Sequence, residues 1–161
     1  EVMESILARP IGILSLGSST LELTAVQLRD NGRNRLPEIL PDFEGSYPLG
    51  AYHMLNMSAE MEGWSLGYRD QQFRNAPKSQ ETALTTWLRR VQGHINQKWG
   101  NQHKDFAAVF VVGGMLKVPS VREWTRKQFR NAVIAGFDLG EHEDDCITAI
   151  SQGLYRQIPQ G

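Results

Sequence analysis

Two short glycine-containing turns hold the residues of this chain that could bind a small ligand. The first turn, Gly17-Ser18-Ser19-Thr20, follows an apolar run, and its small side chains leave the backbone N–H groups accessible. Concave rows of N–H groups bind phosphate oxygens, and the three hydroxyl groups add further donors. The same four residues are also typical of an ordinary hairpin turn. Taken alone, the turn therefore leaves phosphate binding and a purely structural role both open.

The second turn, Gly113-Gly114, ends the apolar run of residues 106–112 and precedes Pro119. A glycine pair lets the backbone come close to a ligand where any Cβ would clash. The carboxyl end of a buried strand is also where open α/β sheets bind small molecules. Many α/β proteins place a glycine there for packing alone, so this turn, too, has a structural alternative.

The remaining polar clusters have simpler interpretations than catalysis. The acidic run of residues 141–145 is expected to begin the last helix, because the helix dipole favours carboxylates there. Cys146 is expected to be a core residue because Ile147 and Ile150 accompany it. The histidines lack the spacing of metal ligands; they are His53, His94, His103 and His142. The sequence thus identifies no metal site and no catalytic residue.

Composition limits the class of protein. The 161 residues suffice for one domain with a core, and 40% hydrophobic and 22% charged residues are ordinary for a globular protein. A formal net charge of -1 gives no reason to expect a nucleic acid partner. No apolar run approaches the roughly 20 residues of a membrane span, and no secretory signal is evident. With a single cysteine, a cytoplasmic location is the simplest expectation.

Apolar periodicity predicts the elements that position the two turns. Strands are expected at residues 11–16, 21–28, 35–40, 106–112 and 132–137, and helices at 79–99, 120–131 and 144–158. The apolar face of the 79–99 helix would contain Leu84, Leu88, Val91 and Ile95. Residues 1–8 are expected to form one or two helical turns or the end of a longer helix. The alternation of strand and helix in the second half predicts an α/β fold with a parallel or mixed sheet and flanking helices.

Residues 41–78 follow a looser pattern that is rich in methionine and aromatic side chains. About half of these side chains should be core, and an exposed remainder would form a protein contact. They are Tyr47, Tyr52, Met54, Met57, Met61, Trp64 and Tyr68.

The order of turns and elements resembles the C-terminal lobe of the actin-like ATPase superfamily, which includes filament proteins, heat-shock chaperone ATPases and sugar kinases. Residues 15–20 stand where that superfamily has a D-x-G-G-G-T hairpin. Val112-Gly113-Gly114 with Pro119 matches its V-G-G-x-x-x-x-P turn, and residues 149–154 match its closing A-x-x-x-G-L pattern. The resemblance implies a ribonuclease-H-like mixed sheet, with residues 41–78 as a variable insertion and residues 1–8 as a remnant of an interdomain helix.

The resemblance also implies a nucleotide site for ATP or ADP. Phosphates would lie on Gly17, Ser18, Ser19 and Thr20, and adenosine on Gly113, Gly114, Met115 and Lys117. Lys117 matches a basic position that packs on adenine in the chaperone branch. Its alternative role is that of an exposed loop lysine.

One departure from the superfamily pattern concerns hydrolysis. Ser15 replaces the aspartate that organises magnesium, and a neutral hydroxyl cannot supply the charge that a hard divalent cation prefers. Ser18 and Ser19 also narrow the room for phosphate. Glu22 lies two residues past Thr20 and either compensates or simply faces solvent. We therefore expect weak or absent hydrolysis, with magnesium disfavoured.

These observations lead to one preferred function and two alternatives. The preferred one is a nucleotide-binding lobe of a filament-forming or partner-regulated protein, with the ParM-like plasmid-segregation branch as the nearest relative. Residues 41–78 would then carry self-assembly or partner contacts. The first alternative is a degenerate actin-like scaffold without nucleotide chemistry, related to PilM-like pilus assembly proteins. Residues 11–28 of this chain also resemble the first-lobe hairpin of those proteins. A sugar-kinase or polyphosphatase enzyme is disfavoured by Ser15.

Overall fold

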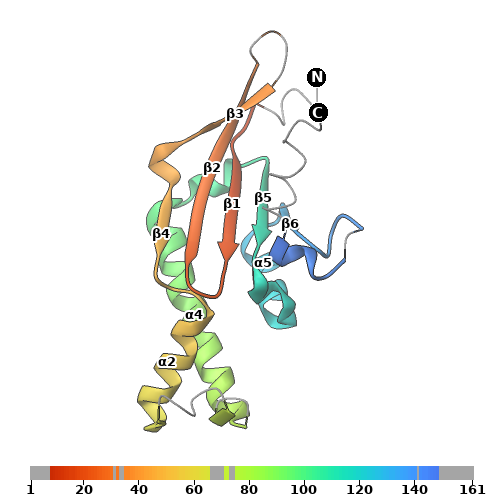
Figure 1. Cartoon of the computed structure of the whole chain (residues 1–161). Helices are drawn as coiled ribbons and strands as arrows, with labels where there is room; N and C mark the ends of the chain where they lie inside the picture. Colours follow the sequence, from red (N-terminus) through yellow and green to blue (C-terminus); the bar gives the residue numbers. More distant parts are fainter. Residues whose placement is uncertain are drawn as a thin grey trace, which may run out of the picture.

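The computed structural model describes residues 8–30, 32, 35–65, 71–72, 75–140 and 142–148. Its centre is a six-stranded mixed sheet with the order β3-β2-β1-β5-β6 (Figure 1). These strands are β1 (Ile11–Leu16), β2 (Leu21–Asp30), β3 (Arg35–Ile39), β5 (Ala108–Val112) and β6 (Ala132–Ile134). Strand β4 (Gly45–Tyr47) pairs with β2 beyond the end of β3. The mixed α/β sheet that the sequence predicts is thus confirmed.

The direction of the strands distinguishes the two ends of the sheet, which we call the carboxyl edge and the amino edge. Strands β1, β5 and β6 run parallel, whereas β2 is antiparallel to β1, β3 and β4. The carboxyl ends of β1 and β5 therefore meet at one edge of the sheet and their amino ends at the opposite edge. Both glycine turns follow carboxyl ends, so the topology alone brings them to the same edge.

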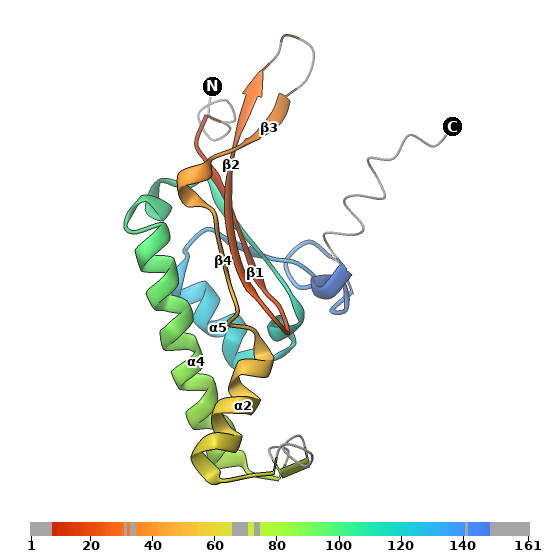
Figure 2. The same ribbon diagram turned by 60° about the vertical axis from the view of Figure 1, so that its left-hand side comes forward.

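The main helices of the described residues are α2 (Ala51–Glu62), α4 (Pro77–Lys98) and α5 (Pro119–Gln128). Figure 2 shows α4 and α5 on the same face of the sheet, while α2 and the first part of α4 extend past the carboxyl edge as a helical arm. Short 3-10 turns complete the described elements; they are η1 (Pro41–Phe43), η2 (Gln102–Asp105) and η3 (Gly114–Lys117). No helix in this described part of the chain is long and apolar enough to cross a membrane.

The core lies between the sheet and α4. Leu14 and Leu16 alternate inward on β1 and are fully buried, as are the inward residues of β2. The buried stripe of α4 contains Ala83, Trp87, Val91 and Ile95, which recur every four residues. The predicted face is thus confirmed at Val91 and Ile95, while Leu84 and Leu88 are partly buried against the core at the border of this stripe.

Two buried tryptophans of the core form hydrogen bonds with the segment between β3 and α2. The indole N–H of Trp87 donates to the Leu49 carbonyl at 3.0 Å, and that of Trp99 donates to the Phe43 carbonyl, also at 3.0 Å. Both indoles are buried, so each N–H needs such an acceptor. The bond from Trp87 fixes the chain just before α2, and the bond from Trp99 fixes η1.

Several predicted boundaries differ from those observed. Helix α4 begins at Pro77 rather than residue 79, and Ser79 does not cap it but donates to Glu62. Strand β4 was not predicted. Strand β6 ends at Ile134, because Asp138 accepts the Ile134 N–H and Gly136 turns the chain with a φ of +84°. Residues 145–148 are helical as expected. Residues 1–7 and 149–154, which carry further predictions, lie outside the described residues.

Candidate functional site

The first glycine turn is held from one side by the N-terminus of α2. The carbonyl oxygens of Gly17, Ser18 and Ser19 accept N–H bonds from Ala51, Tyr52 and Gly50 at 3.1, 2.9 and 3.2 Å, in that order. The first N–H groups of a helix have no partner within the helix, so this arrangement satisfies both groups at once. Three consecutive peptide planes of the turn are therefore fixed in orientation.

The opposite side of the turn consequently presents three N–H groups. In a trans peptide the C=O of one residue and the N–H of the next point in opposite directions, and the described chain has no cis peptide bond. The N–H groups of Ser18, Ser19 and Thr20 thus point away from α2. Within the described residues none of the three has an acceptor. Ser18 and Ser19 are exposed. This row of fixed, unpartnered donors is suited to an anion.

Gly50 makes this arrangement possible, and sequence reasoning missed it. A Cβ on Gly50 would lie 2.4 Å from the carbonyl carbon and oxygen of Ser18 and from the Ser19 nitrogen. All three are backbone atoms and cannot move aside like a side chain. Only glycine therefore allows α2 to begin so close to the hairpin. The signal in the sequence was a glycine immediately before a helix, which is common and indicates no particular partner.

The second glycine turn lies directly beside the first. A Cβ on Gly113 would come within 2.3 Å of the carbonyl oxygen of Leu16, the residue that precedes Gly17. Gly113 also has a φ of +115°, which side chains rarely adopt. Packing on β1 therefore requires glycine at this position, and contact of Gly113 with adenosine stays a prediction. Gly114 differs, because among the described residues its Cβ would meet only Ile147 Cγ1 at 3.8 Å.

A salt bridge joins the second turn to the segment around residue 144. The Lys117 ammonium pairs with the Asp144 carboxylate, and this contact raises the pKa of Lys117 and lowers that of Asp144. Lys117 is thus engaged by the chain itself. Met115 is buried, so its side chain belongs to the core and only its backbone is available to a ligand. The proposed adenosine contacts of both residues stay predictions.

The acidic run begins a helical turn, as expected. The His142 N–H donates to Asp145 Oδ2 at 2.9 Å, and the Asp144 N–H donates to His142 Nδ1 at 3.2 Å, so side chains satisfy two N–H groups at the start of this turn. Cys146 follows and is fully buried, as predicted for a core residue. Burial raises the pKa of its thiol, and its carbonyl accepts the Gly113 N–H at 2.7 Å. The capped segment therefore holds the second turn in place.

Ser15 and Glu22 are opposite each other in the register of β1 and β2. Alternation places both on the sheet face that Leu14 and Leu16 do not occupy. Glu22 is exposed, and its Oε1 accepts a bond from the Thr20 hydroxyl at 3.4 Å. Glu22 therefore faces solvent next to Ser15, and compensation for the missing carboxylate stays a prediction.

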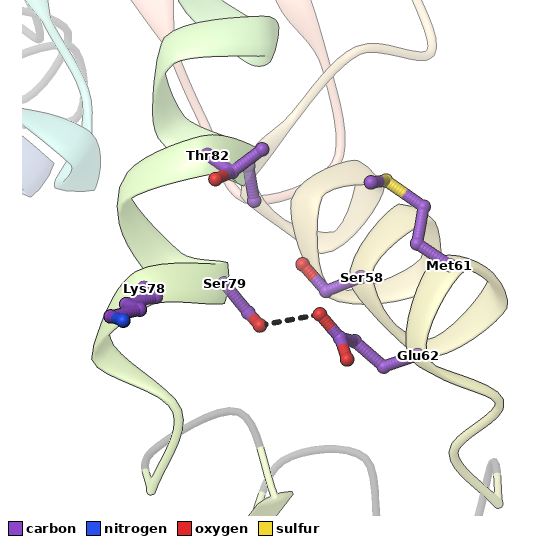
Figure 3. Close-up of a pocket in the computed structure, with 7 residues that line it drawn as sticks. Ser58, Met61, Glu62, Lys78, Ser79 and Thr82 are labelled. Atoms are coloured by element: carbon purple, nitrogen blue, oxygen red, sulfur yellow. Dashed lines mark hydrogen bonds between the residues drawn. The ribbon is translucent and has the colours of Figure 1, made fainter.

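The helical arm contains part of the predicted aromatic and methionine cluster. Met54 is buried, whereas Tyr52 and Met61 are 51% and 67% exposed. A small cavity of about 140 Å³ lies between α2 and α4, where Ser79 Oγ donates to Glu62 Oε1 at 2.8 Å (Figure 3). The division into core and exposed residues follows the prediction. Tyr68 lies outside the described residues.

Comparison with solved structures identifies the fold. One similar structure is the pCBH ParM non-polymerisable quadruple mutant, with a TM-score of 0.66 and 12% identity over 96% of this chain and 50% of that chain. Another is a 15-stranded ParM filament from Clostridium botulinum, with a TM-score of 0.63 and 13% identity over 94% of this chain and 50% of that chain. Ta0583, an archaeal actin homologue, is similar in its complex with ADP (TM-score 0.63, 14% identity, 96% of this chain and 53% of that chain). PilM of a PilM–PilN type IV pilus biogenesis complex is similar as well (0.57, 13%, 94% and 48%).

The chain has the actin-like ATPase fold. It spans about half the length of the solved structures named above and corresponds to one lobe of that fold. The resemblance drawn from the order of the glycine turns is therefore confirmed at the level of fold. No protein-family model matches the sequence, and no curated protein is similar to it in sequence.

Proposed function

We propose that this chain is the nucleotide-binding C-terminal lobe of an actin-like protein, with ATP or ADP as its ligand. The observation that carries the proposal is the row of three N–H groups at Ser18, Ser19 and Thr20, which α2 fixes from behind. Donors that are oriented before binding lose little freedom when a phosphate arrives, so they favour binding at low cost in entropy.

The second turn supplies the neighbouring half of the proposed site. Among the described residues a Cβ on Gly114 would meet only Ile147, and Gly114 lies at the edge where parallel strands of α/β sheets bind ligands. Adenosine would lie along residues 113–117, and its phosphates would extend towards Ser18 and Ser19. Similarity to an archaeal actin homologue in complex with ADP supports this assignment.

Magnesium would have one protein carboxylate at most among Ser15, Thr20 and Glu22. A single carboxylate is compatible with Mg²⁺, which keeps several waters and binds largely through the phosphates of its nucleotide. When bound, magnesium would neutralise part of the phosphate charge. Glu22 is more exposed than Ser15 and is on the opposite strand of the hairpin, so we propose weakened hydrolysis.

Assembly is the proposed role of the helical arm. The exposed Tyr52 and Met61 side chains are of the types enriched in the cores of interfaces. Similarity to a ParM filament supports self-assembly, and similarity to the PilM–PilN complex supports a protein partner. We propose a filament-forming or partner-regulated protein.

A scaffold without nucleotide chemistry is the second candidate. Two observations favour it: Ser15 lacks the charge that magnesium prefers, and Lys117 is already paired with Asp144. In that case the N–H groups of the hairpin would face water or a carboxylate of a protein partner.

Calorimetric titration of ADP distinguishes the two candidates. Ser19→Asp places a negative charge beside the proposed phosphate donors, and Gly114→Trp places a large side chain at the second turn. We expect each variant to weaken ADP binding by about tenfold or more, since like charges or lost shape complementarity oppose the ligand. Ser65→Asp, an equally exposed serine after α2, is the matched control and should leave binding unchanged.

The result that would overturn nucleotide binding is equally concrete. If wild type and all three variants bind ADP with the same affinity, the ligand does not occupy the two turns. If neither this chain nor a longer form that includes a second lobe binds millimolar ADP, the scaffold function replaces the nucleotide function.

A further inference from the structure

A second cavity lies at the edge of the sheet opposite the glycine turns. It encloses about 530 Å³, which is within the range of small-molecule sites. Its lining comes from the segments around the amino ends of β1, β5 and β6. The lining residues are Arg9, His103, Lys104, Phe106, Ala107, Lys127, Gln128, Phe129, Arg130 and Asn131. We name this cavity the amino-edge pocket.

The backbone that surrounds the pocket is held by a continuous set of hydrogen bonds. The Ala107 N–H donates to the Pro10 carbonyl at 2.8 Å, and the Val109 N–H donates to the Asn131 carbonyl at 3.1 Å. The Asn131 side chain in turn donates to the Phe106 carbonyl at 2.6 Å. These bonds tie the three segments together, so the shape of the pocket exists before any ligand arrives.

The floor of the pocket is aromatic and its rim is cationic. Phe106 and Phe129 are each 2% exposed, and the His103 ring stands edge-on to Phe129 with centroids 5.3 Å apart. Arg9, Lys104, Lys127 and Arg130 are exposed and carry permanent positive charge. Among the described residues that line the cavity there is no aspartate or glutamate. The whole chain nevertheless has a net charge of -1, so cations are concentrated here.

The favourable interaction of cations with a helix dipole explains only one of the four cations at the pocket. Lys127 lies in the last turn of α5, where cations complement the helix dipole, and it also pairs with Glu123 at 2.7 Å. Arg9, Lys104 and Arg130 are not in an α-helix, and no ion pair involving them is formed within the described residues. Three unpaired cations from three separate segments therefore converge on one concave site. The pKa of His103 is lowered by burial and by the neighbouring Lys104, as expected next to concentrated positive charge.

We propose that the amino-edge pocket binds a small multivalent anion that carries two or more phosphoryl groups. A single monovalent anion would leave most of the positive charge of the rim uncompensated. A linear chain of phosphoryl groups fits a cavity of this volume and reaches cations on opposite sides of the rim. Guanidinium and ammonium groups form charge-assisted hydrogen bonds with phosphoryl oxygens, which are about twice as strong as neutral ones.

The size of the site favours a small anion over an acidic protein segment. The cations surround a single concavity rather than extend along a groove, and the floor offers two buried aromatic rings rather than exposed backbone. A peptide would place one or two carboxylates in the cavity and leave the rest of its length without contacts. This binding site is separate from the glycine turns, because the two lie at opposite edges of the sheet.

Calorimetry with inorganic tripolyphosphate at low salt tests the proposal. The titration is carried out on the Ser19→Asp variant, so that the hairpin cannot contribute to the signal. We expect binding of one tripolyphosphate, and we expect Lys104→Glu combined with Arg130→Glu to weaken it by about tenfold or more. The matched control is Arg35→Glu combined with Arg89→Glu, which reverses two exposed charges outside the pocket and should change affinity less than about twofold.

A second measurement places the anion at the pocket. Tripolyphosphate next to His103 should raise the pKa of that imidazole in NMR titrations, and it should leave the resonances of the helical arm unchanged. Equal losses in both charge-reversal pairs, or no binding at millimolar tripolyphosphate, would overturn the proposal. Tighter binding of a hexaglutamate peptide than of tripolyphosphate, lost in the Lys104 and Arg130 variant, would also overturn it and assign the pocket to a protein segment.

Discussion

The two edges of the central sheet offer positive potential in different ways. At the carboxyl edge the donors are backbone N–H groups of Ser18, Ser19 and Thr20, which α2 holds in place through three hydrogen bonds. At the amino edge the donors are long side chains, including Lys104 and Arg130, with exposed charged ends. Backbone donors are fixed in geometry and select a shape. Side-chain cations adapt to their ligand and act mainly through charge, so salt screens them readily.

The largest expected effect comes from removing the support of the backbone donors. Gly50→Ala would place a Cβ 2.4 Å from the Ser18 backbone, so α2 and the hairpin must separate. We expect the free energy of unfolding to fall by about 2–4 kcal/mol, measured in urea, together with loss of ADP binding. Gly93→Ala is the matched control, because nothing lies within 4 Å of its added Cβ, and in α4 it should stabilise the protein by up to about 1 kcal/mol.

Binding of tripolyphosphate at the amino edge should survive Gly50→Ala as long as the protein is folded. Simultaneous loss of ADP and tripolyphosphate binding in a folded Gly50→Ala variant would contradict the independence of the two edges. Unchanged ADP affinity in that variant would contradict the role of α2 in orienting the hairpin.

The next effect is the dependence of affinity on salt. Raising the salt concentration from 50 to 200 mM should weaken tripolyphosphate binding about tenfold, because the ligand competes with other ions for several exposed cations. ADP binding should weaken by only about twofold to threefold, since its phosphates contact neutral backbone donors. Parallel calorimetric titrations at the two salt concentrations measure both. Identical salt dependence at the two edges would remove the distinction between shape and charge.

A smaller effect is expected from Glu22, the carboxylate that faces Ser15 across the hairpin. Glu22→Gln should reduce the gain in ADP affinity on adding magnesium by about threefold, because one hard oxygen ligand is lost. Affinity without magnesium should stay the same or rise slightly, since a negative charge near the phosphates has been removed. The exposed Glu44 on the neighbouring segment provides the matched control as Glu44→Gln. Equal effects of the two variants would leave Glu22 without a role in magnesium binding.

The rate at which a thiol reagent labels Cys146 reports on opening of the chain at the carboxyl edge, and it needs no charge-changing substitution there. Its thiol is fully buried, burial raises its pKa, and its carbonyl accepts the Gly113 N–H. Modification by a thiol reagent therefore requires the segment around residue 146 to open. We expect slow labelling in native protein, and ADP should slow it further, by about twofold to fivefold, if it stabilises the closed segment. Tripolyphosphate, bound at the far edge in the Ser19→Asp variant, should leave the labelling rate unchanged.

The two edges also differ in how far the sequence could predict them. The hairpin and the Gly113-Gly114 turn were predictable because each interrupts a strongly apolar run, which is a local signal. The need for Gly50 was not, since it arises from contact with Ser18, far away in the chain. Strand β4 has only three residues, too few to show a period. The cations of the amino-edge pocket are distributed over three segments that are far apart in the sequence, so only the parallel strand order reveals their convergence.

The smallest expected effect concerns pH at the amino edge. The pKa of His103 in the folded protein lies below its ordinary value of 6.5, because burial and Lys104 oppose protonation. As pH falls below about 6.5, the unfolded chain takes up the proton first, so the free energy of unfolding declines until pH passes the folded pKa. His103→Gln should reduce that decline in urea titrations between pH 7 and about pH 5. Tripolyphosphate should reduce it in wild type too, because an anion at the rim raises the folded pKa. If it has no effect on the slope although it binds, the anion occupies some site other than the amino-edge pocket.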